Sequence, residues 1–256
     1  MNQPLTPPTA KRANRRREHH GDVFIDPYEW LRDKDDPEVI GHLEAENAYT
    51  ADATAHLEPL RQKIFDEIKA RTKETDLSVP TRRDLWWYYA RSFEGKQYGV
   101  HCRCPVTDAE DWTPPTFDEH TEIPGEQVLL DENVEADGHD YFALGAATVS
   151  LDGNVLAYSV DVKGDERYTL KFKDLRTGKL YDDSIVGIGS GGIWAADNRT
   201  FYYTTVDEAW RPDNVWRHRL GAGLPGEKVY HEPDERFWVG IGRSRSNKYV
   251  FIASGS

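Results

Sequence analysis

The sequence predicts a mainly β protein: an incomplete β-propeller of about four blades, preceded by an N-terminal α-helical segment. Aromatic residues make up 12% of the 256 residues and gather in short segments with strand-like alternation. Three polar turns with Gly153, Asn198 and Asn247 at their tips each precede an apolar strand, and the tips lie 45 and 49 residues apart. A period of roughly 40–50 residues with several short strands is typical of propeller blades. Accidental similarity within a β-sandwich is the alternative.

Charge and cysteine count limit the classes of function. The formal net charge is −13, and an acidic surface repels nucleic acids and anionic membranes while attracting cationic ligands. Simple solubility explains the same charge. Cys102 and Cys104 stand at i and i+2 in a predicted strand, too far apart for an easy disulfide. Because no signal peptide or apolar run of about 18 residues is evident, we expect a cytoplasmic protein without nucleic-acid or membrane partners.

Residues 1–20 are predicted to be a flexible basic tail. Its basic cluster consists of Lys11, Arg12, Arg15, Arg16 and Arg17. Such a cluster is also typical of a nucleic-acid-binding arm, but the rest of the chain has the wrong charge for that partner. A tail held along an acidic body is therefore the better interpretation. His19 and His20, followed by Asp22, form a poor metal site because further ligands are missing.

Residues 21–76 are predicted to form the N-terminal helical segment. Asp36 is a favourable helix cap, and Pro37 stands at the first helical position. Apolar residues follow at helical spacing until Pro59 interrupts them, so the segment is one kinked helix or two consecutive helices that end near residues 71–74. An apolar anchor precedes the helix and consists of Tyr28, Trp30 and Leu31.

Residues 77–256 are predicted to form the partial propeller. The first blade would contain strands at Asp84–Arg91 and Tyr98–Arg103, joined by a hairpin loop, and an acidic insertion follows it. Gln127–Asp131 is predicted to be another short strand. The repeat adds second strands at 168–175 and 214–220. Because a propeller closes with typically 4–8 blades and this chain stops inside a predicted strand, we expect the propeller to be cut off.

The sequence offers no convincing catalytic, cofactor or metal residue. Ser190 lies in Gly187–Gly192, which departs from the G-x-S-x-G nucleophile motif and from a phosphate loop, so we expect a flexible turn before a strand. His101, Cys102 and Cys104 lack a second ligand pair for zinc, and the cysteines are expected in the core. Acid pairs are too numerous to single out a general acid and base. They are Asp33, Asp35 and Asp36, then Asp182 and Asp183, then Asp234 and Glu235.

Several long segments resemble one known family. HHGD, DPYEWLRD and EAENAYT within residues 19–50 are similar to the N-terminal signature of the prolyl oligopeptidase family. DVKGDERYTLKFKDLRTGKL at residues 161–180 is similar to its propeller. Within the family the chain is most similar to the oligopeptidase B (protease II) branch. The resemblance covers nearly the whole chain, except the tail and residues 106–124.

The resemblance implies a seven-bladed propeller that caps a C-terminal α/β-hydrolase domain and restricts entry to short peptides. It implies a serine oligopeptidase that cleaves after Arg or Lys, with short basic peptides and the hydrolase domain as partners. The catalytic triad would lie in that domain, so no catalytic residue is transferred here and the chain alone is expected to be inactive. A stand-alone binding propeller without catalysis is the alternative.

The resemblance also implies that residues 21–76 pack on the hydrolase domain. That domain has no counterpart in this sequence, so we expect the apolar face with Trp30 and Leu43 to be poorly buried. Each large apolar side chain left exposed forfeits about 1.5–3 kcal/mol. The segment is therefore expected to be mobile, prone to aggregation or loosely laid on the blades.

Overall fold

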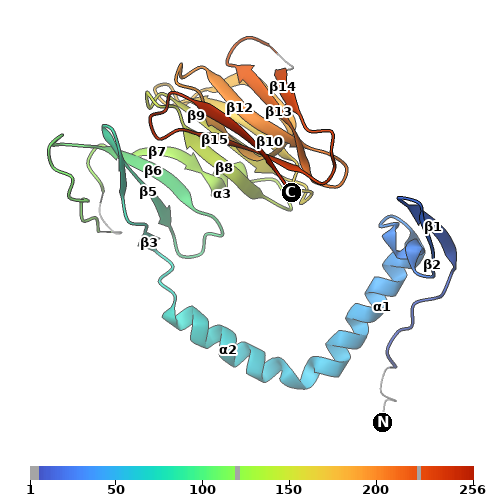
Figure 1. Ribbon diagram of the computed structural model, residues 1–256. Coiled ribbons are helices and arrows are strands. Elements are labelled where there is room, and N and C mark those ends of the chain that lie inside the picture. The colour runs from blue at the N-terminus through green and yellow to red at the C-terminus, as the bar shows by residue number, and fades with distance from the viewer. Residues whose placement is uncertain (1–5, 119–121, 224–225) are drawn as a thin grey trace. The chain divides into compact units, whose positions relative to one another are not determined.

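A computed structural model describes residues 6–118, 122–223 and 226–256 (Figure 1). The chain falls into two compact units, which divide between Lys73 and Glu74, three residues before the boundary predicted after residue 76. Each unit is described by itself. Among the described helices, none has the length and apolar character needed to cross a membrane.

The first unit begins with a hairpin of β1 (Arg15–His19) and β2 (Asp22–Asp26). The backbone φ angles of His20 and Gly21 are 50° and 81°, which is the geometry of a tight two-residue hairpin turn. The placement of Arg15–His19 in a flexible tail is thus corrected. Pairing of these residues with β2 was missed because they are charged rather than apolar. The first five residues of the predicted tail lie outside the described part of the chain.

The helices follow the predicted pattern. They are the 3₁₀ helix η1 (Glu29–Arg32), α1 (Pro37–Thr54), the 3₁₀ helix η2 (Ala55–Leu57) and α2 (Glu58–Arg71). The Asp36 side chain accepts a hydrogen bond from the Glu38 backbone N–H at 2.8 Å, which confirms the predicted cap. The interruption near Pro59 and the end at Arg71 are confirmed as well.

The apolar side chains of this unit remain largely uncovered. Leu43 is 51% exposed, as predicted. Trp30 is half-buried, because its indole N–H donates to the Lys11 carbonyl oxygen at 3.0 Å and the Lys11 Nζ atom lies 4.9 Å from its ring centroid. Further exposed apolar residues on the two helices are Ile40, Leu60, Ile64, Phe65 and Ile68.

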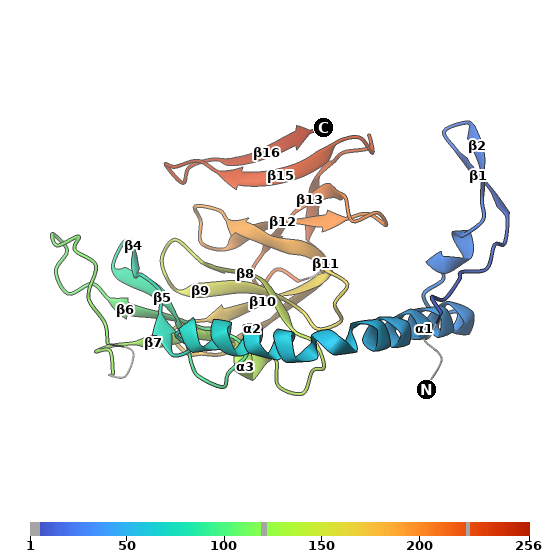
Figure 2. The ribbon, with the colours of Figure 1, turned by 90° about the horizontal axis from the view of Figure 1, so that it is seen from below.

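The second unit is the partial propeller (Figures 1 and 2). Its first blade contains, from the inner to the outer strand, β3 (Asp76–Leu77) with β4 (Thr81–Arg83), β5 (Trp86–Ser92), β6 (Val100–Pro105) and β7 (Gln127–Asp131). The short helix α3 (Glu132–Glu135) leads to the second blade. The second blade contains β8 (Ala143–Val149), β9 (Val155–Asp161), β10 (Tyr168–Asp174) and the first half of β11 (Leu180–Trp194).

The third and fourth blades follow in the same order. Blade 3 contains the second half of β11, then β12 (Thr200–Val206), β13 (Pro212–Arg219) and β14 (Glu227–His231). The start of blade 4 is the pair β15 (Trp238–Arg243) and β16 (Val250–Gly255). Three four-stranded blades and two strands of a fourth confirm the predicted mainly β, incomplete propeller.

The repeated turn tips have the backbone conformation that their sequence predicts. The φ angles of Gly153, Asn198 and Asn247 are 74°, 56° and 60°. Glycine and asparagine tolerate this left-handed region better than other residues do. The tips of neighbouring blades also touch, because the Asn198 side-chain oxygen accepts from the Asp152 backbone N–H at 3.0 Å.

The glycine-rich segment at Gly187–Gly192 is not the predicted flexible turn, because it lies inside the long strand β11. Its first half pairs with β10 of blade 2, and its second half pairs with β12 of blade 3. A Cβ atom on Gly145 of β8 would lie 2.5 Å from the Ser190 carbonyl oxygen, and one on Gly191 would lie 2.8 Å from the Ala146 Cβ. Glycine is therefore needed where the inner strands approach each other closely.

The core lies between the blades. Phe172, Trp194 and Phe201 meet edge to face between blades 2 and 3, with ring centroids 5.1–5.7 Å apart. A second cluster joins blades 1 and 2 around Leu130 and Tyr158. These aromatic contacts hold successive blades together.

Candidate functional site

The structure places the predicted serine and cysteine candidates in structural positions. Ser190 is exposed on β11, and its carbonyl oxygen accepts from the Ser159 hydroxyl at 2.5 Å. Cys102 and Cys104 are free thiols, 1% and 4% exposed, as expected of core residues. Burial raises the pKa of Cys102 to about 12 and also raises the pKa of Cys104, so neither is an activated nucleophile.

The histidines that were rejected as metal ligands from the sequence contact other side chains. His101 directly precedes Cys102 in β6, so its side chain points to the opposite face of the strand, where its Nε2 atom is 2.8 Å from Glu132 Oε1. The rings of His19 and His20 are 4.0 Å apart in the hairpin. Across residues 6–118, 122–223 and 226–256, no group of three His, Cys, Asp or Glu residues is arranged to hold a metal ion.

The basic cluster of the N-terminal region is largely engaged by its own unit. Lys11 forms an ion pair with Glu38, and Arg16 with Glu18. Arg17 reaches two carboxylates, Asp26 at 3.3 Å and Glu29 at 3.0 Å. Three of the five basic side chains of the cluster, Lys11, Arg16 and Arg17, are thus paired with carboxylates of the first unit.

The predicted acid pairs have different structural roles. Asp33 accepts from the Asp35 backbone N–H at 3.3 Å, next to the Asp36 cap. Asp234 forms an ion pair with Arg236 at 2.6 Å, and the Arg236 hydrogen bond lowers its pKa to about 2. No two of these carboxylates are brought together in the way that a general acid and base would require.

Asp183 and His218 form a buried ionisable pair that was not predicted from the sequence, with side chains only 8% and 1% exposed. His218 Nε2 lies 2.7 Å from Asp183 Oδ1, and the Gly221 backbone N–H is 3.2 and 3.3 Å from the two carboxylate oxygens. An ionised carboxylate only accepts hydrogen bonds, so the geometry assigns the imidazole proton to Nε2. Because Asp183 belongs to β11 of blade 2 and His218 to β13 of blade 3, the pair joins two blades.

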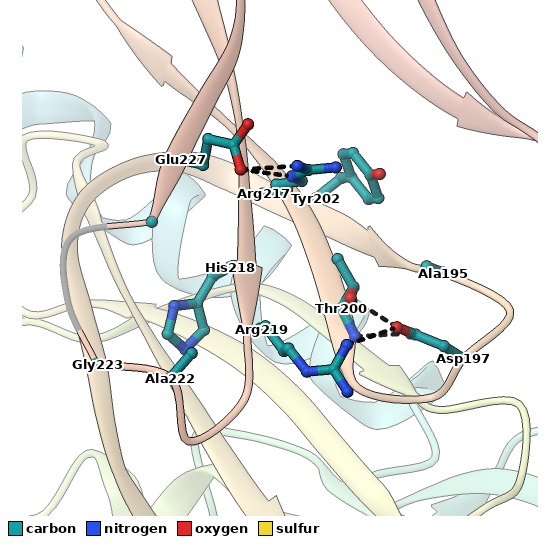
Figure 3. A pocket seen from close by; sticks show the side chains of 11 residues that line it. Ala195, Asp197, Thr200, Tyr202, Arg217, His218, Arg219, Ala222, Gly223 and Glu227 are labelled. Atoms are coloured by element: carbon teal, nitrogen blue, oxygen red, sulfur yellow. Dashed lines mark hydrogen bonds and ion pairs between the residues drawn. The ribbon is translucent and has the colours of Figure 1, made fainter.

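A cavity of about 670 Å³ lies beside this pair in blade 3 (Figure 3). Its polar groups bind each other: Arg217 donates twice to Glu227, at 3.0 and 2.7 Å, and the Thr200 hydroxyl donates to Asp197 at 2.7 Å. The hydroxyl is thus engaged by a carboxylate and not by a histidine. The cavity offers no nucleophile paired with a base.

Acidic residues are more numerous on one face of the propeller than on the other. Successive strands of a blade are antiparallel, so the connections alternate between the faces. One face carries twelve acids and five bases in residues 93–99, 132–142, 162–167, 207–211 and 232–237. The opposite face carries nine acids and eight bases in the described residues 82–85, 106–118, 122–126, 150–154, 175–179, 195–199 and 243–249. On that face the turns that follow the inner strands, at 82–85, 150–154, 195–199 and 243–249, carry six bases and three acids. The acidic excess of the connections is therefore larger on the first face, called here the acidic face.

The fold and sequence together identify the family. The family model described as "Prolyl oligopeptidase, N-terminal beta-propeller domain" matches residues 7–256. The chain belongs to the prolyl oligopeptidase family. It is 41% identical to dipeptidyl aminopeptidase BI of Pseudoxanthomonas mexicana, covering 97% of this chain and 35% of that protein. It is 34% identical to Protease 2 of Moraxella lacunata, with the same two coverages.

Solved structures of this family are similar to the chain. Oligopeptidase B from Leishmania major gives a TM-score of 0.86 at 27% identity, covering 98% of this chain and 36% of that one. Oligopeptidase B from Trypanosoma brucei, in a closed form with covalently bound antipain, gives 0.83 at 30% identity, with the same coverages. The predicted family is confirmed. This chain spans about a third of the length of these relatives.

Proposed function

We propose that this chain is the N-terminal and propeller portion of a serine oligopeptidase that cleaves short peptides after Arg or Lys. The observation that carries the proposal is the family match across residues 7–256, together with the similarity to oligopeptidase B. The reaction would be acyl transfer through a serine nucleophile, a histidine base and an orienting aspartate, all supplied by a hydrolase domain. This chain would contribute the gate that limits substrate size.

The acidic face of the propeller supports a preference for basic peptides. A negative field raises the local concentration of cationic substrates and speeds their encounter. The hypothesis makes a kinetic claim: amide replacements on the acidic face should reduce the salt dependence of the association rate of an Arg-containing peptide. An unaltered salt dependence would show that the field has no such role.

A second candidate activity is removal of dipeptides from free amino termini. It is favoured by the 41% identity to a protein named dipeptidyl aminopeptidase. The two activities differ in what they require of the substrate. An oligopeptidase accepts a blocked amino terminus, whereas an aminopeptidase needs a free one.

A location in the cytoplasm is also part of the proposal. Its support is the pair of free, buried cysteines, which persist as thiols in reducing compartments. Fractionation of cells that express the tagged protein would test it, and recovery in the periplasm or medium would contradict it.

The test compares the 256-residue chain with the product of its reading frame expressed to its own stop codon. Fluorogenic substrates place Arg, Lys or Pro before the scissile bond, with blocked or free amino termini. We expect the reading-frame product to cleave the blocked Arg and Lys substrates, sensitive to a serine reagent, and the 256-residue chain to cleave none. Cleavage of only the free-amino dipeptide substrate would favour the aminopeptidase. No cleavage by either protein would favour a stand-alone binding module.

A further inference from the structure

A second cavity, called here the rim pocket, lies where the inner strands end. Its volume is about 260 Å³. The turn after β4 in blade 1, the turn after β8 in blade 2 and Arg243 at the end of β15 line it together. The residues of the lining that matter chemically are Arg83, Asp84, Trp86, Tyr88, Asp152 and Arg243.

A buried guanidinium group lies directly behind the wall of the rim pocket. Arg103 of β6 is 3% exposed, and its Cζ atom lies 3.8 Å from the Trp86 ring centroid. Its Nη1 atom is 2.6 Å from the Gly153 carbonyl oxygen and 3.4 Å from the Tyr88 hydroxyl, and its Nε atom is 2.8 Å from Gln127 Oε1. All these partners are neutral, and no described carboxylate pairs with it. Because a buried charge without a counter-ion is costly, the wall would gain from an anion nearby.

Further hydrogen-bond donors of the pocket have no acceptor among the described residues. The Arg83 guanidinium lies 5.6 Å from the Tyr88 ring centroid and makes no hydrogen bond or ion pair within the described ranges. The Trp86 indole N–H is likewise without a described acceptor. Arg243 donates its Nη1 to the Trp194 carbonyl oxygen at 3.2 Å, which leaves its other N–H groups for a ligand. Guanidinium groups bind carboxylates through paired N–H donors.

Two carboxylates also line the pocket, and their situations differ. Asp152 is engaged within its own turn, where it accepts from the Ser150 hydroxyl at 2.6 Å and from the Asn154 backbone N–H at 3.2 Å. Asp84 is exposed, and its carboxylate has no described partner. Asp84 is therefore the group that would compete with an anionic ligand for Arg83 and Arg243.

We propose that the rim pocket binds the carboxylate of a peptide C-terminus. Arg83 and Arg243 donate to the two oxygens, and Trp86 and Tyr88 form the apolar wall for the last side chain. Arg103 supplies positive potential from behind that wall. The site is formed entirely by this chain, so it is testable without any peptidase activity.

The experiment is a calorimetric titration of the 256-residue chain with three probes: acetyl-Ala-Phe as the free acid, its C-terminal amide, and acetate. We expect the free acid to bind at least tenfold more tightly than the amide. Arg83→Gln should weaken binding of the acid about tenfold, because a charge-assisted pair is lost. Asp84→Asn should strengthen it, because a competitor is removed. Arg245→Gln is the matched control, since it removes the same charge from the same face but does not line the pocket.

Each outcome decides the proposal. Equal binding of acid and amide, or an equal loss in Arg245→Gln and Arg83→Gln, would overturn it, because the attraction would then be non-specific. Acetate binding as tightly as the dipeptide acid would support the carboxylate site and assign it to free small carboxylates. Arg243→Gln would also remove a contact to blade 3. Arg83→Gln is therefore the deciding variant, because Arg83 is exposed. Thermal unfolding of each variant checks that it is folded.

Discussion

Removal of the Asp183 carboxylate should destabilise the propeller more than removal of the carboxylate of its sequence neighbour, Asp182. Asp183→Ala leaves the His218 ring N–H and the Gly221 backbone N–H without their acceptor, and His218 is only 1% exposed. A buried donor left unsatisfied costs about 1–3 kcal/mol, so two donors give about 2–6 kcal/mol. For a unit of this size 1 kcal/mol lowers the melting temperature by about 2–4 °C, so we expect a fall of about 4–24 °C.

The assay is thermal unfolding of the 256-residue chain by calorimetry, and the matched control is Asp182→Ala. Asp182 is the adjacent carboxylate and is exposed on the same strand. Surface substitutions of this kind change stability by about 0.5 kcal/mol or less. If the two variants melt at the same temperature, the buried pair does not hold blades 2 and 3 together, and the reasoning fails.

Three further predictions concern other parts of the propeller. Gly192→Ala should destabilise the chain by about 1–3 kcal/mol in urea unfolding, because the new methyl group would overlap the Tyr202 carbonyl oxygen, whereas Gly240→Ala has open space and should be neutral. In native protein at pH 8 the two thiols of β6 should not react with a thiol reagent, but both should react in denaturant. The Arg176 hydrogen bond lowers the pKa of Asp174 to about 2, so carbon-detected NMR should find that Arg176→Gln raises this pKa. Since a depressed pKa stabilises the fold above pH 4, that contribution is lost between pH 4 and 2.

Much of the fold could be predicted because its signals are local. Turn tips need residues that tolerate positive φ angles, and glycine or asparagine at such a tip is visible in any sequence. The cap at Asp36 is equally local. The strand over Gly187–Gly192 was missed for the opposite reason. Gly191 is required by close contact with Ala146 of β8, which lies more than forty residues earlier, and locally the glycines of this segment resemble a turn.

The sites were less predictable because their partners are distant in sequence. Asp183 was noted only as one of a pair with Asp182, since nothing near it indicates a histidine 35 residues later. Unbroken alternation from the buried Asp213 and Val215 would place Arg217 on the buried face and His218 on the exposed one. A register shift in the pairing of β13 with β14, between Val215 and Trp216, interrupts this alternation, and His218 is buried instead. The rim pocket is harder still, because it combines turns from blades 1 and 2 with an arginine from blade 4.

The net charge of −13 does not describe the local charge that a peptide would encounter at each face of the propeller. An average over the whole chain predicts attraction of cations everywhere, yet the turns at one end of the inner strands carry more bases than acids. A short peptide with a basic side chain and a free C-terminus carries one positive and one negative charge. The acidic face would attract the positive charge, and the rim pocket at the opposite face would bind the negative one. Long-range attraction acts on the side chain at the acidic face, whereas the carboxylate needs the directed donors of Arg83 and Arg243 at the other. Salt should therefore weaken the first interaction much more than the second, because a partly enclosed pair is screened less than an open surface.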